Sequence, residues 1–244
     1  LELLRNANLA LHEVKKTGGN NYHILSHTNG IQSFKDYSLS RDIKKALEND
    51  EMTLYFQPRV DAETNQIIGA EALIRWNHPE WGLISPHAFI PIAEENGLIS
   101  AIDEWVFKEV CRRIKDWRDR GLNVVPISIN VSTTDFWNSN FLHEVTAMVE
   151  SYDISQKDIE FEITESMVLS KCEQVTYSIN KLKELGFKII LDDFGKGYST
   201  LSYLTQFPFD VIKIDKSFVQ NMLNGKGNIH LVKSIIYIAR GLNI

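Results

Sequence analysis

The sequence predicts an α/β fold of the TIM-like barrel type, in which parallel strands alternate with the helices that cover them. Short apolar segments and amphipathic segments alternate along most of the chain, and this alternation is typical of parallel sheets. The length of 244 residues fits one barrel of about 250 residues. Because the chain has neither a Gly-x-Gly-x-x-Gly motif nor a phosphate-loop lysine motif, a barrel is a better interpretation than a dinucleotide-binding fold.

Strand-like and helix-like segments follow one another after residue 51. The expected strands are 52–59, 67–74, 124–131, 158–164, 187–192 and 210–215. The expected helices are 86–95, 102–119, 141–151, 171–185, 199–206 and 228–242. A short turn at Asp61 to Asn65 joins the first two strands, which is consistent with an antiparallel pair because parallel neighbours need a longer crossover.

Residues 1–35 are expected to be separate from the barrel. One apolar helix face is followed by a short strand at 22–25, and these two elements cannot bury themselves alone. The polar stretch 26–35 resembles a linker, and a new helix is expected to start at Ser40. We therefore place a boundary near residue 36, with the barrel domain at 36–244.

Composition limits the classes of partner. The net charge of −6 argues against a broad surface for polymeric nucleic acid, whereas a small anionic ligand could still bind beside metals. No apolar run approaches the roughly 20 residues that cross a bilayer, so we expect no membrane contact by this chain. The chain has only two cysteines, so a disulfide framework is not expected. A reducing cytoplasm is therefore the expected location. The chain does not begin with Met, so we expect a longer parent protein that could carry a membrane anchor upstream.

Polar side chains recur near the ends of the expected strands, opposite the apolar positions. They are Glu71, Asn130, Glu162, Asp192 and Asp193. In a barrel, inward residues near the C-terminal strand ends face the active site. One such carboxylate would more often be a solvated loop residue or a helix cap, but several together need a compensating cation. Carboxylate and amide oxygens select Mg²⁺ or Mn²⁺ over zinc.

Six short motifs occur in a fixed order. They are Tyr55-Phe56-Gln57-Pro58, Glu71-Ala72-Leu73-Ile74-Arg75-Trp76 with His78-Pro79, Asn130-Val131-Ser132, Glu162-Ile163-Thr164-Glu165, Asp192-Asp193-Phe194-Gly195 and Asp210-Val211-Ile212-Lys213-Ile214-Asp215. Glu-Ala-Leu alone is common in any helix, but six motifs in order are specific. From about residue 38 to 244, the chain resembles the EAL domain, the family of cyclic-di-GMP phosphodiesterases.

The resemblance implies hydrolysis of one phosphodiester bond of cyclic-di-GMP to give linear pGpG, in a barrel whose first strand is antiparallel to the rest. It implies that one metal is bound by Glu71, Asn130, Glu162 and Asp192. Asp193 would help to hold a second metal. Two ions, Mg²⁺ or Mn²⁺, would clamp the phosphate and lower the pKa of the attacking water.

The resemblance also implies roles for five further residues. Lys213 would hold the attacking water or the charge that develops on the phosphoryl oxygens, and Asp215 would orient neighbouring groups and substrate. An interior Lys213–Asp215 pair without a catalytic role is the alternative. Arg75 would grip a phosphate, or form only a surface ion pair.

Gln57 would contact a guanine edge, or be an ordinary strand-end amide. Glu165 would steady the loop 195–199, or be a carboxylate near a helix N-terminus. This loop is linked to dimerisation in the family, so a homodimer is implied. Lys196 departs from the pattern, because the family usually has a small hydroxyl residue there.

Residues 1–25 resemble the last helix and strand of a GGDEF diguanylate cyclase domain, which often precedes an EAL domain. An ordinary amphipathic helix is the alternative. No Gly-Gly-Asp-Glu-Phe signature is present, so cyclase activity is not expected in this chain.

The resemblance further implies a strand beyond residue 244 with a Glu-Gly-Val-Glu-like motif, which carries a metal ligand and the general base. We therefore expect a barrel that lacks its last strand-helix units and is much less active than its parent. Two alternatives to an enzyme remain. One is a receptor that binds cyclic-di-GMP without cutting it, and the other is a dimerisation scaffold.

Overall fold

The computed structural model describes residues 27–138, 140–170, 173–196, 201–222 and 226–244, together with residues 11, 14 and 20. It divides into a smaller unit, residues 1–53 and 74–99, and a larger unit, residues 54–73 and 100–244. The helix and strand expected in residues 1–25 lie almost entirely outside the described residues, so the GGDEF-like tail stays a prediction.

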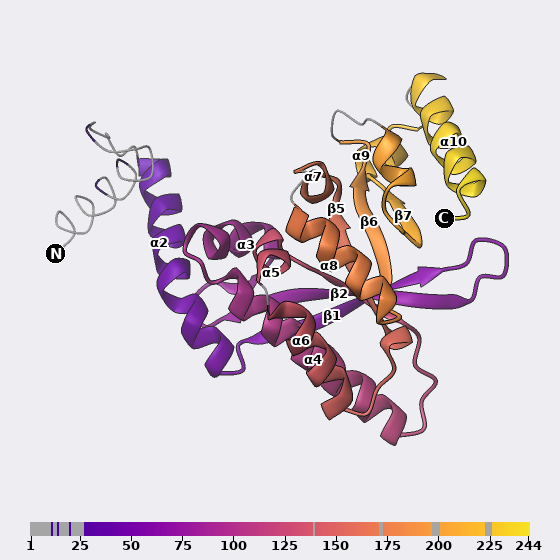
Figure 1. The fold of residues 1–244 in the computed structure, drawn as a ribbon. Coiled ribbons are helices and arrows are strands. Elements are labelled where there is room, and N and C mark those ends of the chain that lie inside the picture. Colours follow the sequence, from indigo (N-terminus) through magenta and orange to yellow (C-terminus); the bar gives the residue numbers. More distant parts are fainter. Residues whose placement is uncertain are drawn as a thin grey trace. The chain divides into compact units, whose positions relative to one another are not determined.

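A seven-stranded mixed sheet is the framework of the fold (Figure 1). Its strands are β1 (Met52–Val60), β2 (Ile67–His78), β3 (Gly82–Ile84), β4 (Ile127–Asn130), β5 (Ile159–Thr164), β6 (Lys188–Phe194) and β7 (Val211–Ile214). The order is β1-β2-β4-β5-β6-β7, with β3 paired to β2. Strands β2, β4, β5, β6 and β7 pair in parallel. The Asp61 N–H donates to the Gln66 carbonyl at 2.9 Å, and this tight turn makes β1 antiparallel to β2.

Helices follow the strands as the sequence predicts. They are α2 (His27–Glu48), α3 (Pro86–Glu95), α4 (Ile99–Asp119), α5 (Thr133–Trp137), α6 (Phe141–Ser151), α7 (Glu165–Leu169), α8 (Glu173–Glu184), α9 (Lys216–Gln220) and α10 (Lys226–Gly241), with 3₁₀ turns η1 (Gln156–Asp158) and η2 (Leu201–Thr205). In the described part of the helix expected at 199–206, residues 201–205 form a 3₁₀ turn instead. The expected linker at 26–35 is wrong from residue 27 onwards, because α2 already includes it.

The larger unit packs the outward faces of its strands against helices. Ile127, Ile129 and Phe161 are almost fully buried, as the alternation predicts. The Phe161 ring lies 5.2 Å from Phe187 and 5.9 Å from Phe107, measured between centroids. This packing fixes β4 and β5, and therefore the inward side chains that alternate with these residues.

The smaller unit has its own core around Trp76, which follows the Glu-Ala-Leu signature. The Trp76 side chain is fully buried and packs edge-on against Phe89 at 5.6 Å. Its indole N–H donates to a carboxylate oxygen of Glu51 at 3.0 Å. Trp76, at the end of the motif that begins with Glu71, is thus structural.

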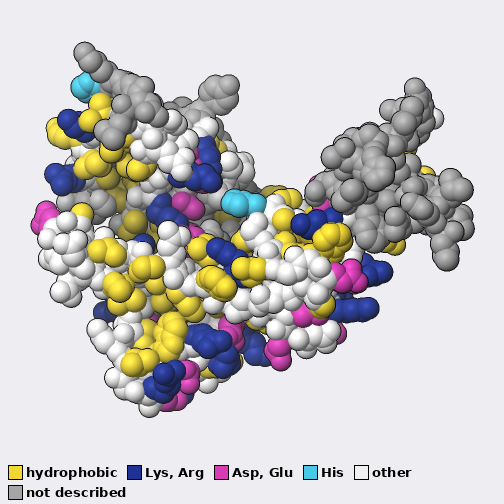
Figure 2. All heavy atoms as spheres, turned by 180° about the vertical axis from the view of Figure 1, so that it is seen from behind, with side chains coloured by type: hydrophobic (Ala, Val, Ile, Leu, Met, Phe, Trp, Pro, Cys, Tyr) yellow, Lys and Arg dark blue, Asp and Glu magenta, His cyan; other side chains and the backbone are white. Residues whose placement is uncertain are grey.

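On the face drawn in Figure 2, Lys and Arg side chains lie between Asp and Glu side chains, and the described residues there form no single broad basic surface. Of the helices that the structure describes, none is both long enough and apolar enough to span a bilayer.

Close packing around Gly69 gives a first testable prediction. An ideal Cβ at Gly69 would lie 2.8 Å from Nε of Arg59, and the Arg59 guanidinium is paired with the buried carboxylate of Glu160. Arg59 cannot move away without leaving Glu160 only the longer contact with Lys188, at 3.7 Å. We expect Gly69→Ala to lower the free energy of unfolding by about 1–3 kcal/mol in urea denaturation.

Gly241→Ala is the matched control, because nothing lies within 4 Å of its ideal Cβ. We expect a change within about 0.5 kcal/mol there. Equal stability of the two variants would contradict the assigned packing.

Candidate active site

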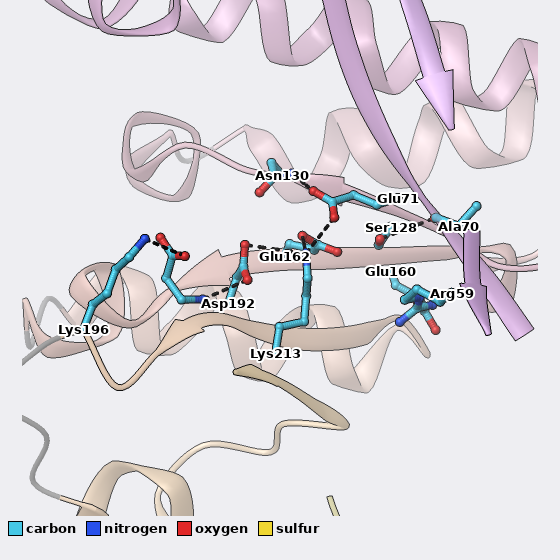
Figure 3. A network of polar contacts seen from close by, with 11 residues as sticks. Arg59, Ala70, Glu71, Ser128, Asn130, Glu160, Glu162, Asp192, Lys196 and Lys213 are labelled. Carbon is cyan, nitrogen blue, oxygen red and sulfur yellow. Dashed lines mark hydrogen bonds and ion pairs between the residues drawn. The ribbon is translucent and has the colours of Figure 1, made fainter. Parts of the chain in front are cut away.

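The ammonium of Lys213, on β7, lies among carboxylates from three other strands (Figure 3). Its Nζ donates to Glu71 Oε2 at 2.8 Å and to Glu162 Oε2 at 2.6 Å. Asp192 Oδ2 lies 3.6 Å from the same nitrogen. Asn130 Nδ2 donates to the other oxygen of Glu71 at 3.0 Å. We call these five side chains the Lys213 cluster.

Strand register explains why residues far apart in sequence meet here. Glu71 pairs with Ser128 across β2 and β4, and Asn130 pairs with Glu162 across β4 and β5. The expectation that Glu71 ends its strand is wrong, because β2 continues to His78 and pairs there with β3. Parallel neighbours nevertheless bring Glu71 to the same end of the sheet as the others.

Burial makes the charges of the cluster interdependent. The Glu162 side chain is 0% exposed. Burial raises the pKa of Glu162 above its ordinary value, although Lys213 opposes this shift. Burial likewise raises the pKa of Asp192 against the opposing effect of Lys213. Burial lowers the pKa of Lys213, but Glu162 and its neighbours raise it more, so that the net shift is upward. Three acidic groups thus share one ammonium.

The donor set suits a hard divalent cation. It offers carboxylate oxygens and one amide, and Oε1 of Glu162 is buried without a hydrogen-bond partner. Within the described residues, no three His, Cys, Asp or Glu side chains are grouped closely enough to hold a metal by themselves. The Lys213 ammonium lies where the carboxylates converge, and it supplies the positive charge that such a group requires.

A second polar group follows β6. Lys196 Nζ lies 2.9 Å from Asp193 Oδ1 and 2.9 Å from Asp215 Oδ2. Asp215 caps α9 by accepting the Ser217 N–H at 2.9 Å. The Ser217 hydroxyl and Lys196 hold the pKa of Asp215 well below its ordinary value. The alternative of a Lys213–Asp215 pair is therefore wrong, because each residue has other ionic partners.

Glu165 connects α7 to the segment after β6. Its buried carboxylate accepts the Gly195 N–H at 2.9 Å and the Tyr203 hydroxyl at 2.9 Å. Gly195 has φ 101°, a conformation that favours glycine. Glu165 would need contacts of this kind in order to steady the loop 195–199. Residues 197–200 lie outside the described residues, so the loop role stays a prediction.

The two expected substrate ligands, Gln57 and Arg75, have different surroundings. Gln57 is exposed within β1, and the expectation that it ends the strand is wrong because β1 runs to Val60. Arg75 belongs to the smaller unit, where its Nη1 donates to the Ile74 carbonyl at 2.8 Å. Both substrate contacts stay predictions.

A hollow of about 260 Å³ beside Asn130 was not expected from the sequence. Phe107 and Phe141 line it together with Asp103 and Asp135. The pKa of Asp103 is raised well above its ordinary value. Burial is the largest cause, and the contact with Asp135 is the next largest. No sequence signal distinguishes these acids, because an acid near a helix N-terminus is ordinary.

The chain is similar to known proteins over nearly its whole length. The family described as "EAL domain" matches residues 40–244. The chain is 31% identical over 243 residues to "Cyclic di-GMP phosphodiesterase NbdA" of Pseudomonas aeruginosa, covering 100% of this chain and 31% of that protein. It is 33% identical over 243 residues to "Bifunctional diguanylate cyclase/cyclic di-GMP phosphodiesterase MucR" of the same organism, covering 100% and 36%. The chain thus spans about a third of the length of these relatives.

The solved structure "PaMucR Phosphodiesterase, c-di-GMP complex" has a TM-score of 0.80 and 35% identity, covering 85% of this chain and 84% of that one. This similarity confirms the predicted α/β fold, of the TIM-like barrel type. The family match also includes every motif from Tyr55-Phe56-Gln57-Pro58 to Asp215. The chain therefore belongs to the EAL domain family.

Proposed function

We propose that this chain supplies the catalytic site that hydrolyses one phosphodiester bond of cyclic-di-GMP to linear pGpG, in bacterial second-messenger signalling. The single observation that carries the proposal is the Lys213 cluster, in which four oxygen-bearing side chains surround one cation. Membership of the EAL family supports the substrate, because NbdA and MucR are named cyclic-di-GMP phosphodiesterases.

Glu71, Asn130, Glu162 and Asp192 would hold one Mg²⁺ or Mn²⁺ ion, and Asp193 would help to hold a second. When bound, the ions neutralise phosphate charge and lower the pKa of a bound water. Lys213 already donates to two of these carboxylates, so its ammonium is placed to hold the attacking water or to stabilise charge on the phosphoryl oxygens. Arg75 and Gln57 would bind phosphate and guanine, and Asp215 would orient neighbouring groups.

The hollow beside Asn130 is lined by Ile129 and Phe161, which belong to the helix-facing side of the strands. We therefore do not propose it as the substrate site. A homodimer and a cytoplasmic location remain part of the proposal.

A cyclic-di-GMP receptor is the second candidate. One observation favours it: the Lys213 ammonium already lies at the centre of the carboxylates, so the cluster holds one positive charge without a metal. In a receptor, the dinucleotide would bind while the phosphodiester bond stays intact.

One assay separates the candidates. The protein is incubated with cyclic-di-GMP and Mg²⁺ or Mn²⁺, with a parallel EDTA-treated sample, and pGpG is measured by chromatography. We expect pGpG only with metal. Tight binding without product would support the receptor, and no binding would contradict both.

A further inference from the structure

Lys196 occupies an unusual place beside the expected second metal ligand. Its ammonium bridges Asp193 and Asp215 at 2.9 Å from each. The backbone reinforces this position, because the Lys196 N–H donates to the Asp193 carbonyl at 3.3 Å. Asp193 itself has φ 55°, so the chain turns back on itself here. Figure 3 shows Lys196 on the opposite side of Asp192 from Lys213.

The two carboxylates differ in how freely they can leave Lys196. The Asp215 side chain is 1% exposed and is fixed as the cap of α9, whereas Asp193 is 43% exposed. A cation that arrives from solvent can therefore reach Asp193, and Lys196 can release it while keeping Asp215. A small hydroxyl residue at position 196 could not fill this place.

We propose that Lys196 is an internal cation that competes with the second divalent ion for Asp193, and this rests on the proposed function. Metal binding at Asp193 must then displace the ammonium from one of its two partners. Because like charges repel, the ammonium that stays on Asp215 also disfavours the incoming ion. The consequence is weaker binding of the second ion than a neutral residue at 196 would permit.

The test uses Mn²⁺ alone, without substrate. Mn²⁺ is titrated into the wild-type chain, Lys196→Thr and Lys196→Met, and binding is followed by calorimetry and by the Mn²⁺ electron paramagnetic resonance signal. Both variants are expected to bind the weaker ion about three- to tenfold more tightly, because a partly exposed ion pair is worth little more. Met is included because it has no oxygen that could become a new ligand.

Lys233→Thr is the matched control, since Lys233 is exposed on α10 and its replacement changes the net charge equally. Unchanged affinity in both Lys196 variants would overturn the proposal. Equal tightening in Lys233→Thr, or tightening in Lys196→Thr alone, would also overturn it. Thermal unfolding measurements check that each variant is folded. If Lys196→Thr does not fold, Lys196→Met alone tests the proposal. Tightened Mn²⁺ binding without any pGpG formation would support this inference while contradicting the proposed function.

Discussion

Replacing Glu162 by Gln is expected to reduce cyclic-di-GMP hydrolysis by the natural protein about 10²- to 10³-fold, because a metal ion and the charge it neutralises are worth several kcal/mol in the transition state. The change keeps the size of the side chain but removes its charge. Glu162 Oε1 is buried and has no hydrogen-bond partner, so this oxygen can bind an ion without losing a hydrogen bond. The rate of pGpG formation and the affinity for Mn²⁺ should fall together.

Glu160→Gln is the matched control for this prediction. Glu160 is also buried on β5, two residues earlier, but it pairs with Arg59 instead of the Lys213 cluster. We expect Glu160→Gln to lower stability and to leave Mn²⁺ affinity nearly unchanged. Hydrolysis at the wild-type rate by the folded Glu162→Gln protein would contradict the assigned role.

Replacing Lys213 by Met is expected to destabilise the metal-free 244-residue chain by about 3–5 kcal/mol, since it removes the ammonium that Glu71 and buried Glu162 share. Urea denaturation with EDTA measures this loss. Mn²⁺ should restore most of the stability, because an ion bound by the same carboxylates replaces the lost charge. A Lys213→Met chain that is as stable as wild type in EDTA would show that the cluster needs no cation.

The same variant should respond to pH in a defined direction. Burial already raises the pKa of Glu162 and Asp192, and removal of Lys213 raises them further. A carboxyl whose pKa is raised in the folded state binds protons there before the unfolded chain does. Stability therefore increases as pH falls from the raised folded-state pKa towards the ordinary carboxyl value of about 4. Lys213→Met should regain stability relative to wild type across that window, and denaturation at several pH values measures it.

Much of the fold was predictable because two repeats of apolar residues are strong in this sequence: the two-residue alternation of strands and the 3.6-residue period of helices. Ile127 and Ile129 alternate with Ser128 and Asn130, and this alternation predicted both the helix-facing core and the inward polar positions. Helices α3 and α6 match their expected bounds. The expected start of helix α2, at Ser40, was too late. The first part of this helix is polar, and a polar composition resembles that of a linker. Short elements such as α5, α7 and α9 have five residues each, which is too few for a helical period to appear.

The candidate site was predictable as a set of residues but not as a network. Position on the strands and motif order predicted that Glu71, Asn130, Glu162 and Asp192 converge, because parallel register brings them to one end of the sheet. Asp193 was expected in the same row but pairs with Lys196. Ionic partners depend on rotamers and on loops, which sequence periodicity does not specify. Lys213 therefore pairs with Glu71 and Glu162 instead of Asp215, and Lys196 takes Asp215. The hollow at Asp103 depends on how α4 and α6 pack, so no single segment indicates it.

The most direct measurement of the central claim is anomalous diffraction from crystals of this chain that contain Mn²⁺. We expect an anomalous peak bonded to oxygens of Glu71, Glu162 and Asp192, with Asn130 beside it and the Lys213 ammonium moved from its present contacts. No peak at these carboxylates at saturating Mn²⁺, with Lys213 still bound to Glu71 and Glu162, would contradict the assignment of a divalent-metal site.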